Sequence, residues 1–165
     1  MNICRLDKHS ADEVADLWRN ILATSVLPMG GSWTVEKVKA LVTEPNLVAI
    51  GWRHEQTGEM VGFLVYRRLT GVSAIGGGEK IADSVSEIEI WGVRPEFQKK
   101  GLAGQCLTQF LSAELPTDTL WLEVHEGNKP AINIYNRCGF IKTGERKNYY
   151  SDGGTAILME FKKRS

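Results

Sequence analysis

The sequence predicts an α/β fold (α+β with a mixed sheet), in one domain over residues 1–165 with the order β-α-α-β-β-β-α-β-α-β-β. Three observations predict it. A length of 165 residues, with 42% hydrophobic and 24% charged residues, is typical of one globular domain. The spacing of apolar residues alternates along the chain between a helical period and continuous runs typical of strands. A strand, a helix and a second strand follow one another over 87–124, which favours parallel strand pairing.

Two helices are expected in the first quarter of the chain. Ser10 and Glu13 have the spacing of a capping box, and apolar residues then recur at helical spacing up to Pro28. The segment 34–42 repeats this spacing, and Pro45 stops it. The sequence therefore predicts a longer helix followed by a shorter one.

The middle of the chain is rich in strand-forming residues. Segments 47–52 and 60–69 contain β-branched and aromatic residues, and the turn residues between them predict an antiparallel pair. Residues 70–86 include three consecutive glycines and are too polar for the interior of an element, so a loop is expected there. A strand over 87–93 follows.

The last third alternates helices and strands. We expect a helix over 102–114 and a strand over 119–124. Asn128 can cap a further helix, and Gly139 stands where the left-handed residue after a helix belongs. The final elements are the strands of a hairpin, 140–146 and 155–161.

Composition excludes several classes of protein. Lys and Arg number 20 and so do Asp and Glu, so no net positive charge attracts nucleic acid. No apolar run reaches the roughly 20 residues that span a bilayer, and the first residues do not resemble a signal peptide, which favours a cytoplasmic protein. Cys4, Cys106 and Cys138 lack metal-ligand spacing, so we expect buried thiols and neither a disulfide framework nor a metal site.

A basic turn over 93–104 connects a strand to a helix. Free amides at a helix N-terminus attract anions, and Gly101 lets the backbone approach a diphosphate closely. Lys99 and Lys100 add positive charge. The turn therefore predicts a diphosphate site, and a solvated loop that begins a helix is the alternative.

Gln98, Gly101 and Ala103 give the pattern Q-x-x-G-x-A. It resembles the Q/R-x-x-G-x-G/A signature with which the GNAT acyltransferase superfamily holds the pyrophosphate of acyl-CoA, and the element order resembles the GNAT fold. The resemblance implies an N-acetyltransferase with acetyl-CoA as co-substrate. The cofactor-binding residues that it implies are Val93, Gln98, Lys99, Lys100, Gly101, Leu102, Ala103, Gly104 and Asn128.

The segment from Leu120 to Tyr150 is similar to the corresponding part of the ribosomal-protein-alanine N-acetyltransferases. This implies acetyl transfer to a protein N-terminus, such as that of a small ribosomal protein, in a ternary complex. Glu123 then matches the general base and Tyr135 the general acid. The roles suit the chemistry, because the acceptor ammonium must lose a proton and the departing thiolate must gain one. Trp91 departs from the small or aliphatic residue usual in that family.

Alternation along 119–124 supports placing Glu123 in the site. Trp121, Glu123 and His125 share one face, and the aliphatic residues between them belong to the core. Glu87 and Glu89 on the preceding strand are rival bases or contacts to the acceptor.

Three hypotheses about the function stay open, and two of them differ in the acceptor. A basic protein N-terminus would meet an acidic groove, to which Glu87, Glu89 and Glu126 could contribute. A small amine or a lysine side chain is the alternative within the enzyme class. A catalytically silent acyl-CoA-binding module belongs to another class, but it would not need both Glu123 and Tyr135. We expect a monomer or weak dimer with no membrane or nucleic-acid partner.

Overall fold

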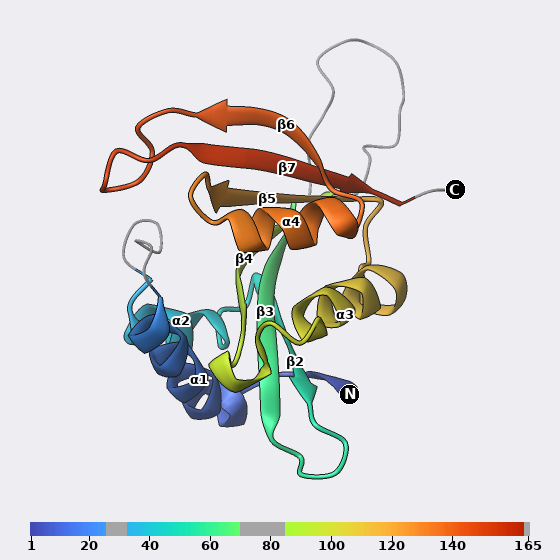
Figure 1. The fold of residues 1–165 in the computed structure, drawn as a ribbon. Helices are drawn as coiled ribbons and strands as arrows, with labels where there is room; N and C mark the ends of the chain where they lie inside the picture. Colours follow the sequence, from blue (N-terminus) through green and yellow to red (C-terminus); the bar gives the residue numbers. More distant parts are fainter. Residues whose placement is uncertain (26–32, 70–84, 164–165) are drawn as a thin grey trace.

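The computed structural model describes residues 1–25, 33–69 and 85–163, and one continuous sheet runs through this part of the chain (Figure 1). The seven strands that it contains there follow the order β1-β2-β3-β4-β5-β7-β6. Only β4 and β5 are parallel within the described sheet, and the other neighbours are antiparallel. The predicted mixed sheet and the parallel pair are confirmed.

The elements follow the predicted order. The strands are β1 (Asn2–Arg5), β2 (Leu47–Arg53), β3 (Met60–Leu69), β4 (Val85–Val93), β5 (Thr119–His125), β6 (Ile141–Arg146) and β7 (Ala156–Lys162). The helices are α1 (Ala11–Thr24), α2 (Val35–Leu41), α3 (Leu102–Gln109) and α4 (Lys129–Arg137). Short helical turns cover Lys8–Ser10, Pro95–Phe97 and Phe110–Glu114, the last a π-helical continuation of α3.

The strand β4 begins two residues earlier than predicted. Val85 and Ser86 belong to it, because both pair with β3 and with β5. The buried Ser86 side chain also accepts a hydrogen bond from the Thr117 hydroxyl at 3.0 Å. The remainder of the expected loop, 70–84, lies outside the described residues.

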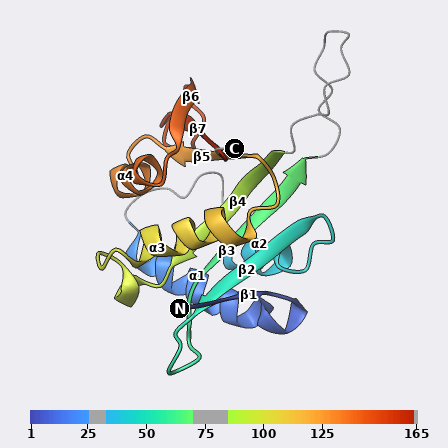
Figure 2. The same ribbon diagram turned by 90° about the vertical axis from the view of Figure 1, so that its right-hand side faces the viewer.

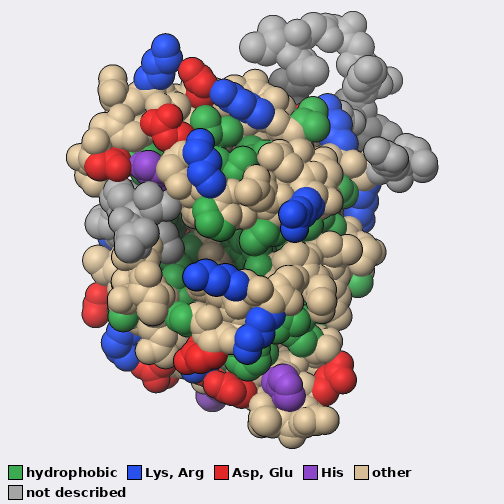
Figure 3. All heavy atoms as spheres, in the orientation of Figure 1, with side chains coloured by type: hydrophobic (Ala, Val, Ile, Leu, Met, Phe, Trp, Pro, Cys, Tyr) green, Lys and Arg blue, Asp and Glu red, His purple; other side chains and the backbone are tan. Residues whose placement is uncertain are grey.

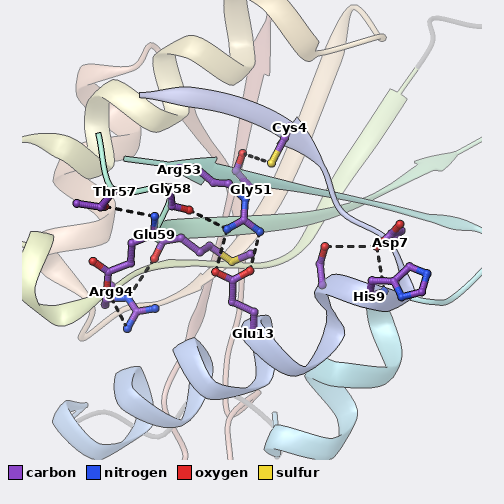
Figure 4. Close-up of polar contacts among 12 residues, drawn as sticks. Cys4, Asp7, His9, Glu13, Gly51, Arg53, Thr57, Gly58, Glu59 and Arg94 are labelled. Carbon is purple, nitrogen blue, oxygen red and sulfur yellow. Dashed lines mark hydrogen bonds and ion pairs between the residues drawn. The ribbon is translucent and has the colours of Figure 1, made fainter. Parts of the chain in front are cut away.

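The predicted capping box at the start of α1 is wrong. The Asp7 carboxylate instead accepts the amide of His9 at 2.9 Å, and the Ser10 side chain makes no capping hydrogen bond. Glu13 accepts two hydrogen bonds from the Arg53 guanidinium, at 2.9 and 2.6 Å (Figure 4). A partner 40 residues away thus replaces the local cap and ties α1 to β2.

Helices cover both faces of the sheet (Figure 2), and a hydrophobic core lies on each face. The core under α1 and α2 includes Trp18, Phe63 and Ile90. The core under α3 and α4 includes Phe110 and Tyr135. No helix in the described segments is both long and apolar enough to cross a bilayer.

The strands β4 and β5 separate after a short parallel contact. Their paired residues are Val85 with Thr119, Ser86 with Leu120 and Glu87 with Trp121. Beyond this contact, β4 stays with β3 and β5 stays with β7, and the two halves of the sheet diverge (Figures 1 and 2). Glu89 is an extra residue at a bulge in β4, and such bulges bend a strand. No pairing joins β4 to β5 beyond Glu87, and we call this separation of the two strands the opening.

The alternation predicted along β5 is confirmed. Leu120, Leu122 and Val124 are at most 5% exposed, whereas Trp121 is 40% exposed on the other face. The predicted ends of α4 are also confirmed, because Asn128 accepts the Ala131 amide at 3.2 Å and Gly139 has φ of +91°. Of the three thiols expected to be buried, only Cys106 is, while Cys4 and Cys138 are half-buried.

Candidate active site

Two side chains of the turn between β4 and α3 hold it against the neighbouring strands. Arg94 donates from Nε to the Met60 carbonyl at 3.0 Å and pairs with Glu59 at 3.4 Å (Figure 4). Gln98 donates from Nε2 to the Val93 carbonyl at 2.9 Å. The predicted signature glutamine therefore holds the turn against the end of β4.

The backbone of this turn exposes amide groups. Lys99 and Gly101 both have positive φ, +58° and +76°, and Gly101 is the N-cap of α3. The first helical hydrogen bond runs from Gln105 to Gly101, so the preceding amides of 102–104 have no acceptor within the helix. These amides and the helix dipole favour an anion at this position.

Space is kept open next to these amides. A methyl group at either Gly101 or Gly104 would meet no atom of the described chain within 4 Å. Glycine at position 104 is therefore not explained by packing inside the protein. A diphosphate close to the backbone fits this turn. On the same side of the molecule, Lys and Arg side chains surround a central hollow lined with hydrophobic side chains (Figure 3).

Tyr135 lies on α4 at the face of the sheet that this helix covers. The side chain is buried, and its hydroxyl accepts a hydrogen bond from Trp91 Nε1 at 2.6 Å. The Phe140 ring packs at a centroid distance of 5.5 Å. Burial raises the pKa of Tyr135 to about 12, so the phenol is protonated at neutral pH and can act as a proton donor.

Glu123 lies on the opposite face of β5, beside a cavity of about 250 Å³. Glu87 and Trp121 line the same cavity. Arg146 from β6 forms an ion pair with Glu123 at 3.2 Å, and the Glu123 side chain is 20% exposed. The base candidate is therefore half-buried and already in contact with a cation.

Glu87 is the second carboxylate of this cavity. Burial raises the pKa of Glu87, and the nearby charges of Glu89 and Glu123 raise it further. Glu89 pairs with Arg67 at 2.8 Å. The structure thus brings two of the three predicted base candidates, Glu123 and Glu87, into one cavity, and the charge of Glu89 acts on Glu87.

Glu126 and Asn128 lie in the segment between β5 and α4. Glu126 accepts the Thr155 amide at 2.7 Å, and this hydrogen bond lowers the pKa of its exposed carboxyl group. Asn128 caps α4 through its side-chain oxygen. Both side chains therefore have structural partners in the protein.

Tyr150 was not among the predicted site residues. Its ring stacks on His125 at 4.6 Å and meets Tyr149 edge-on at 5.2 Å. Burial raises the pKa of Tyr150 to about 12, and the negative charge of Glu123 raises it further. Tyr150 therefore packs between His125 and Tyr149 and is sensitive to the charge of Glu123.

His125 holds the loop between β6 and β7. Its Nδ1 accepts the Gly127 amide at 2.9 Å, and its Nε2 lies 3.1 Å from Asp152. A methyl group at Gly154 would stand 2.2 Å from His125 Nε2, so this glycine permits the contact. The adjacent pair Tyr149 and Tyr150 was the one sequence signal near these contacts. The contacts themselves join residues of different elements, which no local pattern predicts.

The chain matches known proteins in sequence. The model of the Acetyltransferase (GNAT) family matches residues 17–140. A [Ribosomal protein bS18]-alanine N-acetyltransferase of Salmonella typhimurium is 46% identical over 61 residues, 35% of this chain and 40% of that protein. A mycothiol acetyltransferase of Thermobispora bispora is 35% identical over 136 residues, 79% of this chain. The chain spans 43% of that relative's length, less than half of either protein.

Solved structures share the fold. The ribosomal-protein-S18-alanine N-acetyltransferase of Escherichia coli aligns with a TM-score of 0.71 at 23% identity, covering 98% of this chain and 92% of that one. Arabidopsis thaliana NAA60, solved in complex with acetyl-CoA, aligns with a TM-score of 0.73 at 17% identity, covering 98% of both chains. The family match covers most of the residues that build the sheet opening and the amide turn, and the chain therefore belongs to the GNAT acetyltransferase family.

Proposed function

We propose that this chain is a cytoplasmic enzyme that transfers the acetyl group of acetyl-CoA to the N-terminal α-amine of a protein. One observation carries the proposal: Tyr135 and Glu123 flank the opening between β4 and β5 from opposite faces of the sheet. A thioester in the opening would lie between a proton donor and a proton acceptor. The turn at 98–104 offers amides for the diphosphate.

Acetyl-CoA supplies an acetyl group activated as a thioester. Glu123 accepts, through water, the proton that the acceptor ammonium loses. The free amine nitrogen then bonds to the carbonyl carbon while the carbon–sulfur bond breaks, and the nitrogen gives its surplus proton to water. Tyr135 gives its phenol proton to the departing sulfur and regains one from solvent. The products are the acetylated amine and CoA with a free thiol, formed by direct transfer in a ternary complex.

Glu87 is the alternative base. Its raised pKa brings this carboxyl group nearer to the working pH, which is the property a general base needs. Glu123 is preferred because its position in the sequence matches the base of the ribosomal-protein-alanine acetyltransferases.

An α-amine suits a single carboxylate base. Its pKa is about 7.7 to 8.0, against about 10.4 for a lysine, and this difference of about 2.5 units is worth about 3.4 kcal/mol of deprotonation. A modest base therefore favours N-terminal amines. The acidic side chains Glu87 and Glu89 would attract a basic peptide, such as the N-terminus of a small ribosomal protein, with Glu126 as a further acidic group.

A small-molecule amine is the second candidate acceptor. The relative that aligns over 79% of this chain is a mycothiol acetyltransferase, whereas the ribosomal-protein relative aligns over 35%. At 136 residues the longer alignment has to extend into the first half of the chain, where α2 lies on the face of the sheet opposite to Tyr135. The acceptor therefore has to be tested directly.

The test is release of CoA thiol in the presence of acetyl-CoA and a panel of acceptors. The panel contains peptides that differ in their first residue, with spermidine and free lysine as controls. We expect the fastest release with peptides that begin with Ala or Ser followed closely by Arg. Release with spermidine or lysine but with none of the peptides would refute the N-terminal acceptor and retain the acetyl transfer.

A further inference from the structure

Trp91 and Tyr135 are in contact on the side of the opening that α4 covers. Trp91 Nε1 lies 2.6 Å from the Tyr135 hydroxyl oxygen, and the ring centroids are 6.1 Å apart. An indole N–H can only donate, so the phenol oxygen is the acceptor. Trp91 comes from β4 beyond the last pair with β5, and the hydrogen bond therefore connects β4 with α4 across the opening.

This contact determines where the phenol proton can point. A phenol oxygen carries one proton and two lone pairs, and the indole N–H occupies one lone pair. Within the described segments, the Tyr135 hydroxyl has no other hydrogen-bond partner, and Phe140 packs against the ring. The O–H bond cannot be directed at the indole and is left without an acceptor among the described residues.

The same hydrogen bond stabilises the phenol after it has given up its proton. Burial disfavours a charged phenolate, whereas the N–H of Trp91 favours it. A hydrogen bond to a charged oxygen is roughly twice as strong as one to a neutral oxygen. The contact therefore strengthens as the proton leaves, and an interaction that strengthens toward the transition state accelerates the step.

We propose that Trp91 is a positioning residue for proton donation by Tyr135. Its indole N–H holds the phenol oxygen so that the O–H faces the departing sulfur, and it stabilises the phenolate that forms. In this step the O–H bond of Tyr135 breaks, the proton bonds to the thiolate released from the thioester, and the phenolate takes a proton from water. The inference rests on the proposed function.

The experiment compares Trp91→Phe, Tyr135→Phe and the double variant by thiol release from acetyl-CoA with a peptide that begins Ala-Arg. Tyr135→Phe should lower kcat by about a hundredfold. Trp91→Phe should lower kcat by about three- to tenfold, the effect of one hydrogen bond, without changing KM for acetyl-CoA. In the Tyr135→Phe background, Trp91→Phe should cause no further loss.

Trp52→Phe is the matched control. Trp52 is fully buried in the same core, and its Nε1 has no hydrogen-bond partner in the described chain. This substitution removes an indole without removing a hydrogen bond. It should lower stability and leave kcat unchanged.

A second replacement guards against misfolding of Trp91→Phe. Replacing the Trp91 indole by benzothiophene, through β-(3-benzothienyl)alanine, keeps the shape and removes the N–H donor. The same loss of kcat is expected. In protein labelled with ¹⁵N-tryptophan, the indole proton of Trp91 should also move upfield in Tyr135→Phe.

Wild-type kcat in both Trp91 replacements would overturn the positioning role, and so would an equal loss with and without the Tyr135 hydroxyl. An unmoved indole resonance would overturn the hydrogen bond itself. If Tyr135→Phe alone keeps wild-type turnover, the proton donor of the proposed function fails and the role of Trp91 fails with it. The single Tyr135 variant therefore distinguishes the two failures.

Discussion

Glu123 and Glu87 share one cavity, so substitution at each should separate their roles. We expect Glu123→Gln to lower kcat by about a hundredfold, with the largest loss at low pH, where deprotonated acceptor amine is scarce. Glu87→Gln should change kcat by less than about fivefold. Rates of thiol release from pH 6 to 9 measure both. If the two effects are reversed, the general base is Glu87.

Glu87 should also affect stability in a pH-dependent way. Its pKa in the folded protein is raised by burial and by neighbouring carboxylates, so the folded state binds the Glu87 proton more tightly than the unfolded state. Protonated Glu87 therefore contributes fully to stability below the pKa that Glu87 has in the unfolded state. This contribution is lost as the pH rises through the pKa that Glu87 has in the folded state.

Glu87→Gln should accordingly raise the free energy of unfolding at pH 7 relative to wild type, and the advantage should disappear near pH 4. Urea denaturation at the two pH values measures the difference. An equal effect at both values would show that the side chain acts through packing and not through its charge.

For single residues, the sequence predicts which face of a strand a side chain lies on better than it predicts distant hydrogen-bond partners. Alternation along β5 was enough to separate Glu123 from the buried aliphatic residues. The bond from Trp91 to Tyr135 spans 44 residues, and no local pattern reports it. The capping box failed for the same reason, since Glu13 finds Arg53 40 residues away.

The turn before α3 allows a test of diphosphate binding at the level of one element. Gly104→Val adds bulk where the described chain leaves open space, and Gly104 lacks the positive φ that would strain the same change at Gly101. We expect the fold to persist and acetyl-CoA affinity to fall by at least about tenfold. Isothermal titration calorimetry measures the affinity.

Ser112→Val, at an exposed position two turns later along the same helical stretch, is the control and should bind normally. Retained affinity in a folded Gly104→Val protein would remove the diphosphate from this turn.

Most elements could be predicted because their signals are local. The caps of α4 at Asn128 and Gly139 and the alternation of β5 depend on nearby residues, and all appear as expected. The position of β7 between β5 and β6 depends on pairing between distant strands, and a hairpin signal does not specify which strand joins the sheet. The start of β4 was misplaced because burial of Ser86 requires Thr117.

The sheet and α1 approach each other closely at Gly92 of β4. A methyl group there would stand 2.5 Å from Cδ1 of Ile21 on α1. Gly92→Ala should therefore lower the free energy of unfolding by about 1 to 3 kcal/mol through overpacking. Adding Ile21→Val, which removes the clashing carbon, should restore part of the loss. Urea denaturation measures both variants, and additive losses would contradict a direct clash.

The opening between β4 and β5 is a property of the whole molecule. It requires the end of parallel pairing at Glu87 and the bulge at Glu89, while one core still packs residues of both halves of the sheet together. The parallel pairing and the bulge both depend on partners in distant segments, so no local pattern in the sequence predicts the shape of the opening.

We propose that the protein acetylates an N-terminal α-amine at the opening between β4 and β5. The most direct measurement is tandem mass spectrometry of one peptide that begins Ala-Arg and carries an internal lysine, after incubation with the protein and acetyl-CoA. Both amines then compete at equal concentration in the same molecule. The account predicts an acetyl group on the α-amine and an unmodified lysine. Acetylation of the lysine with a free N-terminus would contradict it.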